Sequence, residues 1–241
     1  LMHYRLRPTQ PGVNLLASLR QFRPPGAHET DPSPIDLVMV KLDAERVLVM
    51  RDEECQAIVH RTQRDGQEVY RYEPMRHIAQ DADGAITFDP SGGCDPLGYF
   101  TDVGVTPVVG SRGWLLEPYT DREWLWATHR ARYPDAVVAI AKFFAWRGRL
   151  EPYAELRDPD LLITAAEGWS FRSDDGAGTD HGYPLDGSMR ITLILAGPNI
   201  PHGVWEQPQR IVDVAPTILE MIGWRYHPEQ LDGQAIRGIY E

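Results

Sequence analysis

Short apolar segments separated by more polar links dominate the chain between residues 35 and 74. Valine, isoleucine and leucine are enriched in them, as is typical of β-strands. The four segments are IDLVMVKL (35–42), RVLVMR (46–51), QAIVHR (56–61) and EVYRYEP (68–74). The dipeptide Asp65-Gly66 lies between the last two and is a strong signal for a tight hairpin turn. The pattern therefore predicts a small antiparallel β meander.

Helical periodicity replaces this pattern further along the chain. Thr120 is followed three residues later by Glu123, the spacing of a helix capping box, which predicts a helix over 120–132. A second helix is predicted over 133–146, because Pro134 lies near its start and apolar residues recur at helical spacing. These apolar residues are Val137, Ile140, Ala141 and Phe144.

The C-terminal part contains two more apolar runs and a further helix. The runs at 161–166 and 190–200 are predicted to be strands. Between 214 and 223 the pattern is helical, with Asp213 placed to cap the helix and Gly223 placed to end it. Strands that alternate with helices favour an α/β layered fold.

These patterns divide the chain into three regions. Residues 1–34 are an irregular, proline-rich lead-in with one possible short helix at 14–22. Residues 35–110 form a β-rich insertion or cap, and residues 111–241 form the C-terminal α/β part. We expect the functional chemistry in this last part.

The charge of the chain limits its partners. Its formal net charge is −11 at pH 7, whereas nucleic acids and anionic membrane surfaces need clustered positive charge on the protein. No apolar run is long enough to span a membrane. We therefore expect neither a nucleic acid nor a membrane as partner.

The chain has two cysteines, Cys55 and Cys94. Their number and spacing match neither a common metal site nor a disulfide framework. We therefore expect no disulfide framework, a reducing compartment and a cytoplasmic location.

The stretch GTDHGYPLDG, residues 178–187, places two good metal ligands side by side among glycines and a proline. The Asp180 carboxylate and the His181 imidazole are both ligands that Zn²⁺ accepts, and a harder cation would take the carboxylate alone. Adjacent residues of an extended segment point in opposite directions, so the two side chains can serve two neighbouring ions. An Asp-His-Gly turn without any metal is the alternative interpretation of the same residues.

The surroundings of this stretch favour the metal site. GTDHGYPLDGSMRITLILAGPNI, then RIVDVAPTILEMIGW, then LDGQAIRGI resemble consecutive blocks in the C-terminal portion of the alkaline phosphatase superfamily. The likeness is closer to its type I phosphodiesterase/nucleotide pyrophosphatase and sulfatase-like branches. A weaker likeness in NLLASL, IDLVMVK, GCDPLGYF, DREWLWAT and YPDAVVAIAKFF extends it over most of the chain after residue 14.

The resemblance implies a partial alkaline-phosphatase-like α/β/α sheet with a small antiparallel β insertion that shapes the substrate pocket. It implies that Asp180 and His181 bind divalent metal, zinc or alternatively manganese, for hydrolysis of phosphate mono- or diesters. The chain departs from the family in lacking the early metal-binding Asp, the Ser or Thr nucleophile and any Asp-x-x-x-His cluster. We therefore assign no catalytic residue and expect little activity from the chain alone, which would be the C-terminal part of a longer hydrolase.

Two further residues are candidates for the site. Arg190 stands where phosphatase-like members of the family place a histidine ligand; a guanidinium cannot bind a metal, but it can contact an anion. His202 follows about twenty residues after the Asp180-His181 pair and is an alternative metal ligand or a surface histidine.

The missing blocks leave a second function open. A degenerate, metal-free domain of this fold would act through protein contacts, as a homodimer or with a partner chain that covers its exposed apolar surface. The sequence does not decide between phosphate and sulfate esters.

Overall fold

The computed structural model describes residues 19, 22–24, 26–28, 30–52, 54–80, 86–89, 93–108, 112–146, 159–171, 183–198 and 200–239. The chain divides into two compact units, Leu1–Arg190 and Ile191–Glu241. The predicted short helix at 14–22 lies almost entirely outside the described residues.

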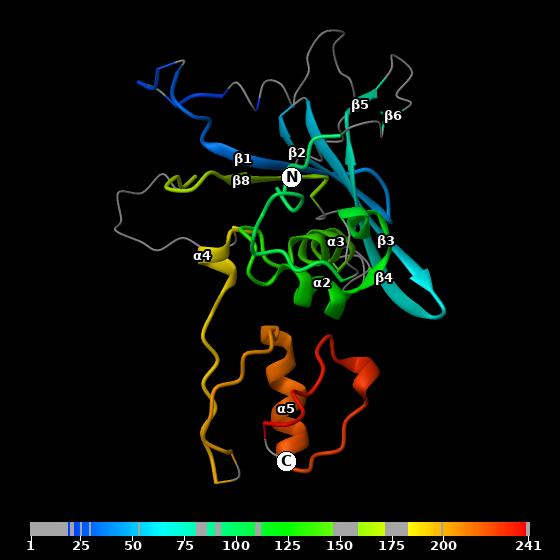
Figure 1. Cartoon of the computed structure of the whole chain (residues 1–241), viewed down its shortest axis with the longest axis vertical. Helices are drawn as coiled ribbons and strands as arrows, with labels where there is room; N and C mark the ends of the chain where they lie inside the picture. Colours follow the sequence, from blue (N-terminus) through cyan, green and yellow to red (C-terminus); the bar gives the residue numbers. More distant parts are fainter. Residues whose placement is uncertain are drawn as a thin grey trace. The chain divides into compact units, whose positions relative to one another are not determined.

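A six-stranded sheet organises the first unit (Figure 1). Its strands lie in the order β7-β4-β3-β2-β1-β8, and every described pairing is antiparallel. The strands are β1 Ile35–Lys41, β2 Arg46–Asp52, β3 Cys55–Arg64, β4 Gln67–Met75, β7 Tyr119–Thr120 and β8 Leu161–Ala165. A separate pair, β5 His77–Gln80 and β6 Ile86–Asp89, forms a small hairpin. The chain therefore has a mixed α/β fold.

The predicted meander is confirmed in strands β1 to β4. At the β3–β4 connection Arg64 pairs with Gln67, and the two residues between them have positive φ angles, 54° for Asp65 and 78° for Gly66. Two successive positive φ angles are the conformation of a type I′ turn, which the Asp-Gly dipeptide favours. Local turn chemistry thus sets the register of this hairpin.

The edge strand β8 is distant in sequence from its neighbour in the sheet. It pairs with β1 in an antiparallel register in which Val38 lies opposite Ile163. Strands β7 and β8, which follow residue 110 in the chain, join the strands of the meander in one sheet of the first unit.

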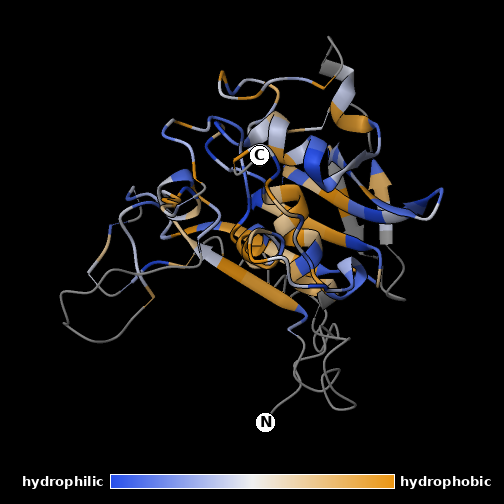
Figure 2. Ribbon diagram, turned by 90° about the horizontal axis from the view of Figure 1, so that it is seen from below, coloured by the Kyte–Doolittle hydropathy of each residue, from blue (hydrophilic) through white to orange (hydrophobic). Residues whose placement is uncertain are grey.

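Both faces of the sheet are buried. Leu37 and Met39 of β1 belong to the core shared with helices α2 Asp121–Thr128 and α3 Ala136–Trp146, whereas Val38 and Val40 belong to a second cluster. Figure 2 shows the apolar residues concentrated along the central strands and the helices next to them. Burial on both faces explains why β1 is a continuous apolar run rather than an alternating one.

The two predicted helices are confirmed, with a different boundary. Thr120 accepts a hydrogen bond from the Glu123 amide, and the Glu123 carboxylate accepts one from the Thr120 amide, so the capping box is complete. Helix α2 ends at Thr128 rather than at residue 132, and the chain turns through Asp135, whose φ is 53°, before α3 begins.

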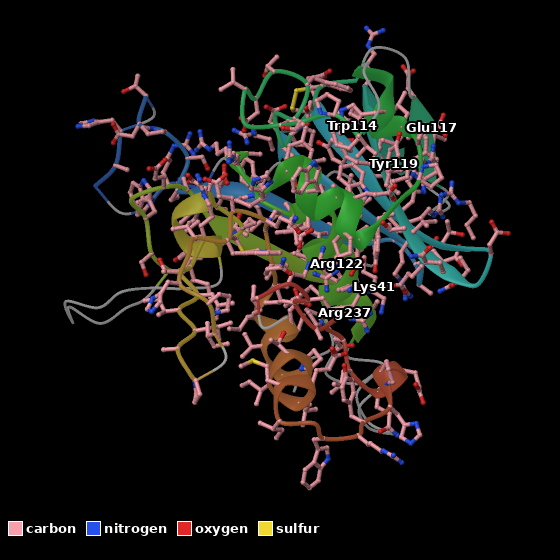
Figure 3. The ribbon with its side chains drawn as sticks, turned by 60° about the horizontal axis from the view of Figure 1, so that its bottom comes forward. Lys41, Trp114, Glu117, Tyr119, Arg122 and Arg237 are labelled. Carbon is pink, nitrogen blue, oxygen red and sulfur yellow. A yellow bond between two sulfur atoms is a disulfide. The ribbon has the colours of Figure 1, made fainter. Side chains whose placement is uncertain are left out.

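Aromatic side chains fill the space between α2 and the sheet edge. Trp114, from the short 3₁₀ helix η1 Arg112–Leu116, has its ring centroid 5.0 Å from that of Trp124 and 5.8 Å from that of Tyr119. Trp114 and Tyr119 are labelled in Figure 3. The indole N–H of Trp124 donates to the Tyr70 carbonyl, so the buried ring has its polar atom paired.

The expectation that the two cysteines form no disulfide framework is wrong. Cys55, at the start of β3, and Cys94 form a disulfide across a sequence separation of 39. Beside it, Asp95 accepts hydrogen bonds from the amides of Leu97, Gly98 and Phe100 and from the Tyr72 hydroxyl. The folded sheet brings together two cysteines that their sequence spacing does not relate.

The predicted strand at 190–200 is also wrong. Its described residues adopt no strand pairing, and Ile191 and Ile194 are 68% and 82% exposed. An apolar run needs a neighbouring strand to pair its backbone groups, and the described part of the chain supplies none here.

Helix α5, Val214–Met221, confirms the last predicted helix, and Gly223 just beyond it has a φ of 70°. Asp213 does not cap this helix with its side chain. Its fully buried carboxylate instead accepts hydrogen bonds from the amides of Arg210, at 2.7 Å, and Gln234, at 2.9 Å. Asp213 therefore holds the last segment of the chain against the helix start.

The remaining short helices among the described residues are α4 Asp186–Met189, η4 Ile211–Asp213 and η5 Pro228–Gln230. No helix among the described residues has the length and apolar character required to cross a membrane.

Candidate functional site

Strand β8 leads toward the segment that carries Asp180 and His181. Just beyond its end, the Ala166 amide donates to the Pro34 carbonyl at 2.8 Å, and the Trp169 amide donates to the Ala166 carbonyl at 2.9 Å. Gly168 has a φ of 83° at the third position of this turn, as in a type II turn. The turn therefore fixes the direction in which the chain leaves the sheet.

The chain returns from this segment through residues 183–190. The amides of Ser188 and Met189 both donate to the Leu185 carbonyl, which closes the single turn of α4. The Asp186 amide donates to the Arg132 carbonyl at 2.8 Å and thereby attaches α4 to the segment between α2 and α3.

A shallow hollow of about 210 Å³ lies between these two flanks. It is lined by Ala166, Glu167, Gly168, Trp169, Tyr183, Leu185, Asp186, Gly187 and Ser188. Asp180 and His181 themselves lie outside the described residues, but the two ends of the segment that contains them converge on this hollow. We take the hollow as the candidate site.

Two arginines pair with the carboxylates of the hollow. Arg190, predicted to contact an anion, forms an ion pair with Asp186 one helical turn before it, and its side chain is 51% exposed. Arg132 lies 3.8 Å from the carboxylate of Glu167, which is 82% exposed. Both pairs are open to solvent, so each contributes little to stability and can exchange partners.

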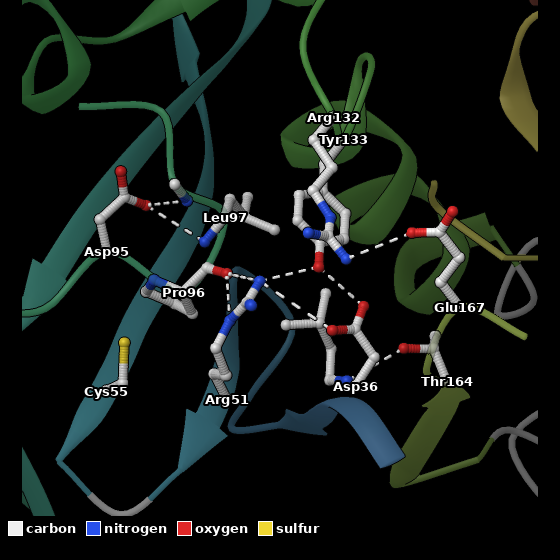
Figure 4. Close-up of polar contacts among 12 residues, drawn as sticks. Asp36, Arg51, Cys55, Asp95, Pro96, Leu97, Arg132, Tyr133, Thr164 and Glu167 are labelled. Carbon is white, nitrogen blue, oxygen red and sulfur yellow. Dashed lines mark hydrogen bonds and ion pairs between the residues drawn. The ribbon is translucent and has the colours of Figure 1, made fainter. Parts of the chain in front are cut away.

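A buried polar network lies between the sheet and α3, next to the end of β8 (Figure 4). The Tyr133 hydroxyl donates to the Asp36 carboxylate at 2.7 Å, and Arg51 donates to the Tyr133 hydroxyl at 2.7 Å and to the Pro96 carbonyl. Burial, and then the Asp36 carboxylate, raise the pKa of Tyr133 to about 12. The phenol therefore stays protonated and keeps donating to Asp36 at neutral pH.

The network connects to the hollow through Arg132. Its guanidinium lies 5.7 Å from the centre of the Tyr133 ring, its amide donates to Asp102 at 2.7 Å, and it contacts both Glu167 and Asp186 as described above. The α4 wall of the hollow is thus attached to Arg132 through a backbone hydrogen bond, whereas the opposite wall is attached to the sheet through the Ala166 amide and the Pro34 carbonyl.

The predicted ligands do not form a complete metal site among the described residues. His202 lies in the second unit and is exposed, and the described residues contain no group of three His, Cys, Asp or Glu side chains able to hold a metal ion. Zinc usually takes three or four protein ligands. Asp180 and His181 would supply two, so a site built on them needs further ligands.

Sequence reasoning did not single out the residues that line the hollow. Glu167, Trp169 and Tyr183 follow no ligand spacing. Gly168, after an apolar strand, marks only the turn that carries Glu167 and Trp169. Asp36 carried a clearer signal, since it is an acidic residue inside an otherwise apolar strand. Such a residue must find a partner on folding.

Compared with protein families, with curated proteins and with solved structures, the chain matches none.

Proposed function

We propose that this chain is the C-terminal, metal-binding part of a hydrolase of phosphate mono- or diesters with an alkaline-phosphatase-like layered fold. The observation that carries the proposal is the hollow at which the two described flanks of the Asp180-His181 segment meet. Asp180 and His181 both belong to the segment that joins the end of β8 to α4, and the two flanks of this segment line one hollow. Ligands on a loop beyond a strand end are common in α/β enzymes.

The sequence resemblance to the alkaline phosphatase superfamily supports the same interpretation, since its blocks occur in the family's order. In the proposed enzyme Asp180 and His181 each bind one divalent cation, zinc or manganese. Such cations activate a hydroxyl nucleophile and stabilise charge on the transferred group. The chain supplies two of the ligands and no assigned nucleophile, so by itself it is expected to have little or no activity.

The exposed apolar run after Arg190 also supports a larger domain. Ile191, Leu193 and Leu195 alternate with Thr192, Ile194 and Ala196, so both faces of the run are largely apolar. A run that is apolar on both faces and largely exposed is expected to be covered by another part of a larger protein.

The proposal is tested on the product of the natural gene, including any coding sequence that precedes residue 1. We expect it to hydrolyse p-nitrophenyl phosphate or bis-p-nitrophenyl phosphate in a zinc- or manganese-dependent reaction, and expect Asp180→Ala to reduce the rate at least about a hundredfold. Hydrolysis that survives both Asp180→Ala and His181→Ala would contradict the proposal. p-Nitrophenyl sulfate tests sulfate esters in the same assay.

A second candidate function is a non-catalytic domain that acts through protein contacts, as a homodimer or with a partner chain. The observation that favours it is the exposed apolar surface of the second unit. Its exposed large apolar residues are Ile191, Leu193, Ile194, Val204, Trp205, Ile211, Val212, Ile218, Ile222 and Trp224. The proposed cytoplasmic location loses the support of its original argument, because Cys55 and Cys94 form a disulfide.

A further inference from the structure

We propose that the hollow between the Ala166–Trp169 turn and α4 binds a small organic cation, such as the ammonium group of a phosphoester. Its assignment as a substrate pocket rests on the proposed function, whereas the binding of a cation does not. The lining combines two aromatic side chains, Trp169 and Tyr183, with two carboxylates, Glu167 and Asp186.

Both kinds of side chain favour a positive charge. The face of an indole or phenol ring attracts a cation through its quadrupole, and tryptophan does so most strongly. The lining contains two acidic residues and no basic one among those described. An anionic or neutral aromatic ligand would contact the same rings, but the carboxylates would not attract it.

The carboxylates are available to such a ligand. The side chain of Glu167 is 82% exposed, and its ion-pair partner Arg132 is 3.8 Å away, so the pair is loose and screened by water. Asp186 keeps its ion pair with Arg190 and is 45% exposed. Glu167 is therefore the carboxylate that can turn toward a bound cation at little cost.

The walls of the hollow are held in place before any ligand binds. Trp169 follows the type II turn at Gly168, and the opposite wall is α4, attached through the Asp186 amide to the Arg132 carbonyl. Trp169 is still 37% exposed, which leaves part of a large aromatic side chain uncovered at the hollow. Walls that are already ordered lower the entropy lost on binding.

The size of the hollow limits the ligand to a small group. Pockets for drug-sized ligands hold about 300–1,000 Å³, whereas this hollow holds about 210 Å³. It can accept a trimethylammonium or primary ammonium group while the rest of an ester extends outside.

The test compares choline with 3,3-dimethyl-1-butanol, which has the same shape but no charge. Ligand-observed NMR titrations of the full chain at constant ionic strength give both dissociation constants. We expect choline to bind at least about tenfold more tightly than the alcohol. Equal binding of the two, or binding of neither, would overturn the proposal.

Substitutions in the lining of the hollow test whether choline binds there. Trp169→Ala and Glu167→Gln are each expected to weaken choline binding by about three- to thirtyfold. The control is Trp126→Ala, which removes a half-exposed tryptophan of α2 that is not part of the hollow and should leave choline binding unchanged. Choline binding that is unaffected by Trp169→Ala would place the cation elsewhere and overturn the proposal.

The metal content of the same samples separates this inference from the proposed function. If the chain binds choline but holds no metal, the result supports the cation-binding hollow and contradicts the proposed hydrolase. If the chain binds metal through Asp180 and His181 but does not bind choline, the result supports the proposed hydrolase and contradicts the cation-binding hollow.

Discussion

The Tyr133 hydroxyl donates a hydrogen bond of 2.7 Å to the carboxylate of Asp36, across a sequence separation of 97 residues. Both residues are buried, and Arg51 donates to the same hydroxyl. The bond connects the start of β1 with the residues that precede α3. The preceding residue, Arg132, accepts a hydrogen bond from the Asp186 amide in the α4 wall of the hollow. The candidate site therefore depends on a polar contact inside the core.

Replacing Tyr133 with phenylalanine should destabilise the protein. Tyr133→Phe leaves the ring in place but removes the donor to Asp36 and the acceptor for Arg51. We expect a loss of about 1–3 kcal/mol in the free energy of unfolding, measured by urea denaturation at pH 7. The control Tyr119→Phe alters a hydroxyl outside this network and should stay within about 0.5 kcal/mol of wild type.

The effect of Tyr133→Phe should depend on pH. The pKa of Tyr133 is raised to about 12 in the folded protein, above the value of about 10 expected for an unfolded chain. The stabilisation is therefore fully present below about pH 10 and is lost as the pH rises toward 12. The difference between wild type and variant should be constant from pH 7 to 9 and shrink above pH 10. A difference that grows above pH 10 would contradict this assignment.

His60 should make the protein sensitive to acid. Burial, and then the nearby Arg71, lower the pKa of His60, while Glu73 at 2.8 Å raises it without reversing the shift. Because the folded-state pKa lies below the unfolded-state value of 6.5, stability is lost as the pH falls from above 6.5 through the folded-state pKa. We expect His60→Gln to lose less stability than wild type between pH 7.5 and 5, in parallel urea titrations. An equal loss in both proteins would exclude His60 as the cause.

The disulfide should contribute substantially to stability. Linking Cys55 to Cys94 restricts the unfolded chain across a separation of 39 residues. The Cys55→Ala/Cys94→Ala double variant should lose about 2–4 kcal/mol of unfolding free energy. Dithiothreitol should destabilise wild type by a similar amount and leave the double variant unchanged. Two free thiols in the native, unreduced protein, found by mass spectrometry, would show that the bond does not form.

Of the two glycines that line the hollow, Gly168 should tolerate substitution by alanine less well than Gly187. Its φ of 83° strains any residue with a Cβ atom, although there is open space around it. We expect Gly168→Ala to cost about 1–2 kcal/mol and to disturb the turn that positions Trp169. Gly187, in the opposite wall, also has open space but no positive φ, so Gly187→Ala is the matched control and should cost much less. Equal costs in thermal denaturation would mean that the turn is not under this constraint.

The exposed run of the second unit should cause self-association. Ile194 is 82% exposed within an apolar segment, so exchange for a charged residue should reduce contacts between chains. We expect the weight-average mass of wild type in sedimentation equilibrium to rise with concentration and that of Ile194→Asp to rise less. Val103 of the first unit is also fully exposed, and Val103→Asp is the control. A wild-type chain that stays monomeric at all concentrations would argue against the protein-contact function.

The sequence patterns correctly predicted the turns, helices and strands that depend on residues close together in the sequence. The Asp65-Gly66 turn and the Thr120–Glu123 capping box each depend on residues a few positions apart, and both formed as expected. Helix α5 and strand β8 likewise followed from their own apolar spacing. Such features need no knowledge of the rest of the fold.

The predictions that failed concern residues whose contact partners lie far away in the sequence. An apolar run indicates burial but not which strand will pair with it, and 190–200 found no strand partner among the described residues. Cys55 and Cys94 meet only because the sheet places the start of β3 beside the segment after β6. For the site, Trp169 and Glu167 became recognisable only when the two flanks of the Asp180-His181 segment were seen to converge.

The most direct measurement is a titration of zinc and manganese into the chelator-treated chain, followed by calorimetry and metal analysis. The Asp180→Ala/His181→Ala double variant is the comparison, with cooperative unfolding checked for both proteins. We predict that wild type retains close to one equivalent of metal or more and that the double variant retains none. Equal metal binding by both proteins, or none by either, would contradict the claim that Asp180 and His181 form a metal site.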